Sequence, residues 1–488
     1  MEFTSLQFFV FIVVSLSANY SFRKILIWPF IMLSINMTFL SSLIGGYSHT
    51  IIPFLLYVIV GYIFIRIITT YKKKIILAFE IFILIISFIY IKQYSVIKVL
   101  HLPSYTFFTI GFSYVLFRII QVLIDVYGSS IKETVSFTQY MNYLFFFLNF
   151  ISGPIQRYND FKVQHENIAD IKLTDESIQC AFNRIVNGYL KIMLIAEVIH
   201  IIHKKYGVEF AIRHNSNGNC FLLAWYSVAV LIFTFYIYYN FSGYMDIVIG
   251  IGKLFCLNIP ENFNKPFNAK NILDFWSRWH ITLSDWFRIY LFNPILKLCM
   301  KNCNFSVNCL GTIAFFITFF IMGVWHGTTV MFIIYGLFLG FGVSTNKLFQ
   351  VSMQNRLGKK IYKTLRENII YQSFCRGMTI SYFSLSLTCL WLDIMQINKI
   401  FGIQFCMIVP TSFIIIAVMI GILSYVQILF QRKWILFLDR KRFVKCTPLF
   451  VKYSPLLYYW KVAFKMIVLY YTIIGVLNDV PEFVYKGY

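Results

Sequence analysis

Long apolar stretches, interrupted by a few polar segments, dominate this chain. A transmembrane helix needs about 20 mostly apolar residues, and by hydropathy we count roughly eleven to thirteen runs near that length. They lie near residues 5–20, 25–44, 50–71, 75–92, 105–127, 140–155, 187–202, 221–240, 243–257, 308–345 (two runs), 378–395, 404–430 and 463–478. The pattern predicts an all-α polytopic membrane protein. The first run lacks a basic start and a cleavage site, so we interpret it as a retained span.

The segment 258–306 is the most informative interruption. Its first part, "LNIPENFNKPFNAKN", has two prolines and five asparagines, which predicts an irregular loop. The following "ILDFWSRWHITLSDWFRIYLF" has an apolar and aromatic stripe at helical period, opposite a polar stripe that includes an Asp274–Arg278 pair. Because this stretch is too polar to span, we expect one helix in the membrane interface, with its tryptophans at headgroup depth and His280 between its two faces.

Composition supports a membrane protein and narrows its partners. The 488 residues are 59% hydrophobic and 13% charged, outside the range of soluble domains. The net charge of +23 comes from Lys and Arg in short loops such as 72–74 and 432–445, which the positive-inside rule places on the cytoplasmic side, with the N-terminus opposite. The sequence lacks a basic tail or a folded basic domain, so we do not expect it to bind nucleic acid. No linker divides the chain, so we expect a single integral membrane domain, 1–488.

Among the ten cysteines and eight histidines, one histidine has unusual surroundings. The cysteines are scattered, and Cys299, Cys303 and Cys309 lack the paired spacing of a metal site, so we predict none. His326, in "MGVWHGT", lies inside more than thirty nearly uninterrupted apolar residues. An ionisable residue at that depth indicates a functional site, although a histidine bonded to a neighbouring helix is the structural alternative. Gly323 and Gly327 would let a backbone or a substrate approach it.

Two further polar points lie in apolar surroundings. Asp246 follows Asn240 in "FSGYMD", and Asp125 lies in "IDVYG". Either aspartate could serve function or bond a neighbouring helix, and the sequence does not separate these alternatives. Histidine suits proton abstraction near neutral pH, and it would equally serve a proton relay in a transporter.

The combination of motifs resembles the membrane-bound O-acyltransferase family, in its bacterial branch. The resemblance rests on "PENFNKPFNAKNILDFWSRWHITLSDWFRIYLF" followed by "MGVWHG", with "ISGPIQRY", "NGYLKIMLIAE" and "FSGYMDIVIGIGKLF" in the family's order. It covers residues 105–400, which we expect to form the catalytic core. It implies interfacial and re-entrant helices around a funnel in the membrane, with His326 catalytic at its base and His280 in a supporting role.

Residues of the polar segment are our candidates for binding the donor. The polar groups His280, Asn262, Asn264 and Arg278 could orient or polarise it, and Lys265 or Arg278 could contact a phosphate. His326 would act as a general base or as a nucleophile that forms an acyl-imidazole, and the sequence leaves both open. The remaining members of the predicted binding set are Trp279, Asp285 and Trp325.

The resemblance also implies a reaction class. The bacterial branch includes alginate and peptidoglycan O-acetyltransferases and teichoic-acid D-alanyltransferases. We expect transfer of a small acyl group from a cytosolic thioester, acyl-CoA or a phosphopantetheine carrier, with no bound cofactor. The acceptor would be a hydroxyl of a cell-surface polysaccharide or of an extracytoplasmic partner protein, and the location the bacterial cytoplasmic (inner) membrane. "FSGYMDIVIGIGKLF" favours acetyl, whereas "NFNKPF" and "SGPIQRY" are also similar to the D-alanyl group.

Departures from the family and rival functions remain. Leu392 and Asp393 stand where relatives often have an aromatic-Arg pair, and the ending "PEFVYKGY" matches only loosely, so contacts near either place are not carried over. A proton-coupled transporter or a lipid flippase would also have many spans with buried polar residues. Such carriers commonly show internal repeats, and none is evident here.

Overall fold

The computed structural model describes residues 5–44, 51–94, 109–442, 467 and 470, and within these it is helical without named strands. The all-α prediction is therefore confirmed for the described chain. The helices are α1 (Leu6–Phe22), α2 (Trp28–Ile44), α3 (Ile51–Tyr71), α4 (Lys74–Ile91), α6 (Phe112–Tyr127), α7 (Phe137–Phe145), α8 (Phe147–Phe150), α9 (Tyr158–Glu166), α10 (Asp175–Tyr189), α11 (Glu197–Lys205), α12 (Val208–His214), α13 (Asn219–Leu254), α14 (Ile272–Trp276), α15 (Ile281–Phe287), α16 (Asn293–Asn302), α17 (Val307–Trp325), α18 (Val330–Glu367), α19 (Ile369–Ser386), α20 (Ile394–Phe401) and α21 (Phe405–Arg442).

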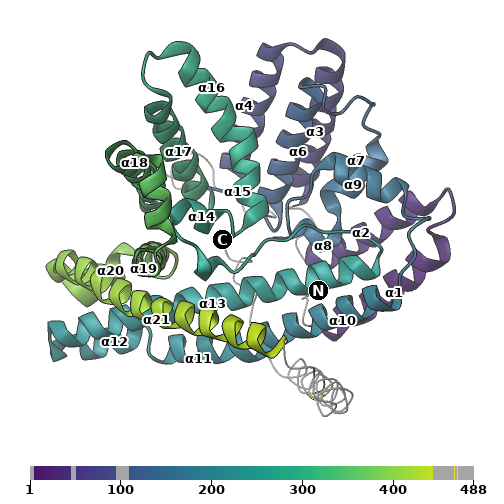
Figure 1. The fold of residues 1–488 in the computed structure, drawn as a ribbon. Helices are drawn as coiled ribbons and strands as arrows, with labels where there is room; N and C mark the ends of the chain where they lie inside the picture. Colours follow the sequence, from purple (N-terminus) through teal and green to yellow (C-terminus); the bar gives the residue numbers. More distant parts are fainter. Residues whose placement is uncertain (1–4, 45–50, 95–108, 443–466, 468–469, 471–488) are drawn as a thin grey trace.

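The helices form two groups that meet at the short helices α14 and α15. Figure 1 shows α10, α11, α13 and α21 running in similar directions in one layer, and α13 contacts each of the other three. Above this layer, α3, α4 and α6 stand on one side and α16, α17 and α18 on the other (Figure 1). The segments far apart in sequence that flank α14 and α15 are therefore brought together at the centre of the protein.

Seven helical segments of the described chain are long and apolar enough to cross a membrane. The expected runs 221–240 and 243–257 form one helix, α13. Helices α1 and α2 are apolar but shorter, at 17 residues each. The expected run 463–478 lies outside the described residues apart from two positions. The two counts differ because the hydropathy count also includes these shorter helices, the run outside the described residues and runs that lie inside the protein.

The run 140–155 is an apolar run that lies inside the protein and does not span the membrane. It folds as the end of α7, the short α8 and a loop, with a break at Phe146. Arg118 of α6, 1% exposed, donates to the carbonyl oxygens of Leu144 at 2.7 Å and Asn149 at 2.6 Å. Irregular backbone inside a membrane protein persists only where other groups satisfy its carbonyls. Arg118 provides that satisfaction, so this apolar run does not span.

Helices α17 and α18 pack closely on either side of the turn that carries His326. A Cβ added to Gly323 would lie 2.3 Å from the Cα of Gly336, which leaves room only for hydrogen. A Cβ at Gly327 would lie 2.1 Å from the ring of Phe332. The first glycine therefore admits another backbone, as the sequence predicts, and the second admits an aromatic ring.

The predicted continuous helix from 272 to 292 is wrong. Residues 277–280 separate α14 from α15, and His280 has a left-handed backbone with φ of 49°. Phe263 pairs with Trp279 in an isolated antiparallel bridge, so the asparagine-rich loop runs back along the break. The tryptophans expected at headgroup depth are buried in the core, with Trp276, Trp279 and Trp286 at 4%, 3% and 7% exposure. Periodicity missed the break because contacts with the distant asparagine-rich loop fix it.

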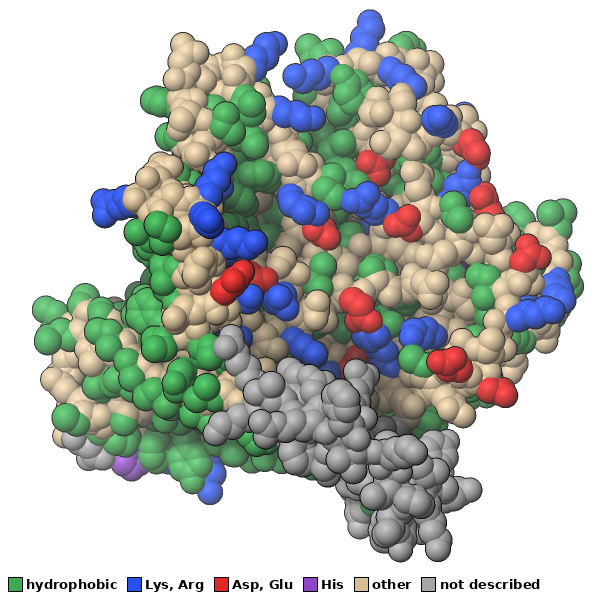
Figure 2. All heavy atoms as spheres, in the orientation of Figure 1, with side chains coloured by type: hydrophobic (Ala, Val, Ile, Leu, Met, Phe, Trp, Pro, Cys, Tyr) green, Lys and Arg blue, Asp and Glu red, His purple; other side chains and the backbone are tan. Residues whose placement is uncertain are grey.

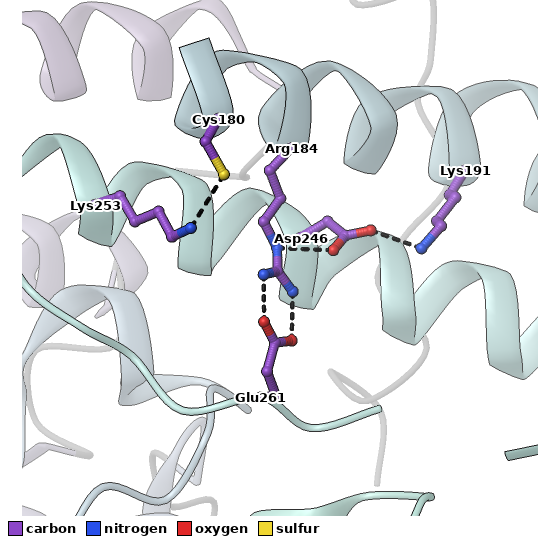
Figure 3. A network of polar contacts seen from close by, with 6 residues as sticks. All are labelled: Cys180, Arg184, Lys191, Asp246, Lys253 and Glu261. Carbon is purple, nitrogen blue, oxygen red and sulfur yellow. Dashed lines mark hydrogen bonds and ion pairs between the residues drawn. The ribbon is translucent and has the colours of Figure 1, made fainter. Parts of the chain in front are cut away.

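Asp246 belongs to an ion network between α10 and α13 (Figure 3). One carboxylate oxygen accepts from Arg184 Nε at 2.9 Å and the other from Lys191 Nζ at 2.6 Å. The same Arg184 also pairs with Glu261, at the start of the asparagine-rich loop. Asp125 likewise accepts a hydrogen bond from Tyr290 at 3.0 Å. These contacts favour the structural alternative for both aspartates.

Candidate active site

His280 contacts a tyrosine from a distant helix. The Tyr114 hydroxyl lies 3.4 Å from Nε2 of His280, and both side chains are buried, at 4% and 1% exposure. The left-handed backbone at His280 begins α15 and brings its ring against Phe241, with ring centroids 4.9 Å apart. Burial, and next the nearby His326, lower the pKa of His280 well below its ordinary value. The imidazole is therefore neutral in the folded protein at physiological pH.

His326 lies next to the same tyrosine. It follows the last residue of α17 and lines a cavity of about 40 Å³ together with Tyr114 and Trp325. This volume holds a few water molecules. Tyr114 touches His280 and faces the cavity of His326, and the charge of one histidine acts on the other. The two histidines named from sequence are thus gathered around one tyrosine.

The rest of the cavity wall contains hydroxyl side chains, two isoleucines, a glycine and one lysine. Ser152, from the "ISGPIQRY" motif, lines the cavity with Tyr114, and Lys92 follows the end of α4. None of the described residues that line the cavity is acidic. The full lining consists of Lys92, Thr109, Ile110, Gly111, Ser113, Tyr114, Ile151, Ser152, Trp325 and His326. Such a wall offers hydrogen bonds to a small polar substrate group but no counter-charge for a cation.

Asn262 is hydrogen-bonded to the start of α15 and does not line the cavity. It is fully buried, and its Oδ1 accepts from the backbone N of Thr282 at 3.0 Å and from that residue's hydroxyl at 2.8 Å. The Asn262 carbonyl also accepts from the backbone N of Ile281 at 3.0 Å. These bonds satisfy the first turn of α15 and thereby fix His280, which immediately precedes it. Asn262 acts on the site through backbone geometry.

Other predicted residues lie around the cavity but do not line it. The backbone N of Asn264 donates to the Arg278 carbonyl at 2.9 Å, and exposed Lys265 has a left-handed backbone. Trp279 stacks on Phe275, with ring centroids 5.6 Å apart. Asp285 pairs with Arg288 at 2.8 Å at the surface. Of the predicted binding set, Trp325 alone is among the residues that line the cavity in the described structure.

Several residues of the site escaped sequence reasoning. Tyr114 and Arg118 lie in the apolar run 105–127, and Lys92 ends another run, so hydropathy assigned all three to spans. Ser152 lies in a motif that was recognised without a role. An arginine in the middle of an apolar run was the one available signal, since charges at that depth are costly and pair with other groups.

Comparison with known proteins agrees with this architecture. The model of the family described as MBOAT, membrane-bound O-acyltransferase family, matches residues 122–390, more than half of the chain. The protein belongs to the membrane-bound O-acyltransferase family. The family expectation is thereby confirmed, and the match includes both histidines, Asn262 and the whole broken-helix region, whereas Lys92 and Tyr114 precede it.

Curated relatives of the chain carry out two kinds of acyl transfer. It is 31% identical to the teichoic acid D-alanyltransferase of Bacillus subtilis (strain 168) over 49% of this chain and 58% of the relative. It is 30% identical to the probable alginate O-acetylase AlgI of Pseudomonas syringae pv. tomato, over 49% and 42% of the two chains. The peptidoglycan O-acetyltransferase of Helicobacter pylori is 32% identical over 44% and 38%. The matches thus span about half the length of these relatives, or less.

Proposed function

We propose that this family member is a membrane O-acyltransferase that moves an acetyl group from a cytosolic thioester to a hydroxyl acceptor. The observation that carries the proposal is the cluster of His326, His280 and Tyr114 at one cavity. Residues 105–400 would form its catalytic core within one membrane domain, 1–488. The donor is acyl-CoA or a phosphopantetheine carrier, and the protein holds no cofactor of its own.

His326 is the proposed general base. It takes the proton from the acceptor hydroxyl as the oxygen attacks the thioester carbonyl, and a tetrahedral oxyanion forms. When the carbon–sulfur bond breaks, the leaving thiolate receives the proton from the imidazolium, so charge and atoms balance. His280 is a positioning residue that fixes the Tyr114 hydroxyl at the cavity. The acyl-imidazole route remains the alternative, and an acylated His326 trapped without acceptor would identify it.

The charge around His326 supports a neutral acyl group. A D-alanyl thioester carries an ammonium group next to its carbonyl carbon. In the cavity that ammonium would lie near Lys92, and two like charges at short range repel each other. An acetyl group meets no such repulsion.

D-alanyl transfer from a carrier protein to teichoic acid is the second candidate. It is favoured by the 31% identity to a relative that is named for this activity. In either case we propose a cell-surface polymer or an extracytoplasmic partner protein as acceptor. We also propose the bacterial cytoplasmic (inner) membrane as location.

Labelled acetyl-CoA supplied to membranes that contain the protein tests the proposal. We expect wild type to transfer label and His326→Ala to transfer none, with expression and monodispersity in detergent unchanged. Label in both samples would remove His326 from the mechanism. If wild type accepts label only from a D-alanyl carrier thioester, the second candidate replaces the first. Failure with both donors would reopen a transporter function.

A further inference from the structure

Arg376 is a buried cation whose hydrogen bonds are incomplete. It lies in α19 with 7% exposure, and its Nε has no hydrogen-bond partner in the described structure. Its two other nitrogens reach only neutral oxygens, Gln427 Oε1 and the Asn268 carbonyl, both at 3.4 Å. These distances exceed the usual range of about 2.7–3.2 Å. A buried guanidinium without a carboxylate is unfavourable unless a ligand supplies the missing charge.

The neighbouring charges do not neutralise Arg376. Arg278 and Asp274 are close enough for their charges to act on it. Asp274 is already engaged, because it accepts from Arg278 Nε at 2.8 Å and from the backbone N of Lys270 at 2.8 Å. Among these three side chains, two guanidinium groups thus face one carboxylate. Their sum is one positive charge. The side chains of Lys265 and Lys270, both exposed, add further positive charge to the loop beside them.

The position of this arginine pair relative to the histidines fits one part of a thioester donor. Phe383, two turns after Arg376 on α19, packs on Trp279 with ring centroids 4.8 Å apart, and Trp279 precedes His280. At 1.5 Å per residue, Arg376 lies about 10 Å along α19 from that level. Figure 2 shows Lys and Arg side chains gathered around a hollow on the face where Figure 1 draws α14 and α15. Arg376 thus lies away from the level of Trp279, beside the loop that carries Lys265 and Lys270.

We propose that Arg376 and Arg278 form an anion site for the phosphate that ends the pantetheine arm of the acyl donor. Guanidinium groups present paired N–H donors that match phosphate oxygens. The inference rests on the proposed function, because it takes the thioester donor as given. Coenzyme A and the carrier-bound prosthetic group share this phosphate, and the site recognises what they have in common.

Binding measurements on the purified protein in detergent separate the site from the reaction. Pantetheine, 4′-phosphopantetheine and coenzyme A are titrated into wild type, Arg376→Met, Arg376→Lys and the matched control Arg213→Met, which changes an exposed arginine of α12. We expect wild type to bind 4′-phosphopantetheine at least about tenfold more tightly than pantetheine, the effect of one charge-assisted hydrogen bond. Arg376→Met should remove most of this difference, and Arg376→Lys should restore part of it.

The outcomes distinguish this inference from the proposed function. Equal affinity of wild type for pantetheine and 4′-phosphopantetheine would overturn the anion site and leave acyl transfer untouched. An equal loss of both ligands in Arg376→Met, with a lower melting temperature, would assign Arg376 a purely structural role. If wild type binds none of the three ligands, the thioester donor, and the proposed function with it, is wrong. If Arg376→Met weakens the binding of coenzyme A but not of 4′-phosphopantetheine, the site recognises the additional phosphates of coenzyme A. That outcome would overturn the assignment to the pantetheine phosphate.

Discussion

The Tyr114 hydroxyl lies 3.4 Å from Nε2 of His280, although 166 positions separate the two residues in the chain. Tyr114 also lines the cavity that His326 faces. Tyr114 therefore contacts the supporting histidine and lines the same cavity as the proposed base. We therefore expect Tyr114 to influence the proposed reaction, although its position inside an apolar run gives no sign of this.

Tyr114→Phe should lower kcat about tenfold while the protein stays folded. The ring is kept, and the hydroxyl contact with His280 is lost, with an effect near that of one hydrogen bond. The matched control is Tyr140→Phe, which removes a buried hydroxyl that donates to the Val58 carbonyl at 2.9 Å, outside the cavity. Label transfer from acetyl-CoA measures both variants. An equal effect of the two changes would contradict a specific role for Tyr114.

His280→Ala should reduce transfer less completely than His326→Ala, because His280 positions another group and does not itself take the proton. His280→Gln is the companion variant, since its amide can still contact the Tyr114 hydroxyl. We expect partial recovery with Gln relative to Ala in the same label assay. If His280→Ala prevents folding, as judged by size-exclusion chromatography, its role is structural and the proposed positioning of Tyr114 fails.

Lys92→Met should change the choice of acyl group. Without the cation, the repulsion that an aminoacyl ammonium meets in the cavity is lost, so the ratio of D-alanyl to acetyl transfer should rise at least about tenfold. Lys92→Arg keeps the charge and should keep the selectivity. Competition between the two labelled thioesters measures the ratio. A ratio unaffected by Lys92→Met would show that the cavity charge does not select the acyl group.

Gly323→Ala should destabilise the packing of α17 on α18. The added methyl group would lie 2.3 Å from the Cα of Gly336, and overpacking of this kind costs about 1–3 kcal/mol. Gly311→Ala, in the same helix, meets nothing within 4 Å and is the matched control. Thermal unfolding in detergent should show a lower midpoint for the first variant and no decrease for the second. Similar midpoints would mean that the helices can separate freely there.

Arg118→Met should be strongly destabilising. It removes the donors that satisfy the carbonyls of Leu144 and Asn149, and each buried acceptor left without a partner costs about 1–3 kcal/mol. Arg66→Met, in α3, replaces an exposed arginine whose side chain makes no such bonds within the described structure. We expect Arg118→Met to be recovered in low yield and to aggregate in detergent, whereas the control should behave as wild type. A well-folded Arg118→Met would show that water can replace these bonds.

The sequence by itself determined the class of the protein and identified two histidines as candidate site residues. Membrane spans are visible in sequence because every lipid-exposed backbone must be helical and apolar over a fixed length. His326 was visible because a polar group at such depth is costly. His280 was found only through its motif, and the Asp274–Arg278 pair was predicted from spacing and is present at 2.8 Å.

Tertiary structure decided the rest, because the deciding contacts join distant parts of the chain. The break before α15 depends on Asn262 and on the bridge between Phe263 and Trp279, so local periodicity gave a continuous helix instead. The run 140–155 does not span because Arg118, on another helix, satisfies its carbonyls. Tyr114, Lys92 and Arg376 have a chemical setting only where helices from different regions meet. Hydropathy scores each residue by its preference for lipid over water. The roles of these three residues depend on neighbours that only the folded chain brings close.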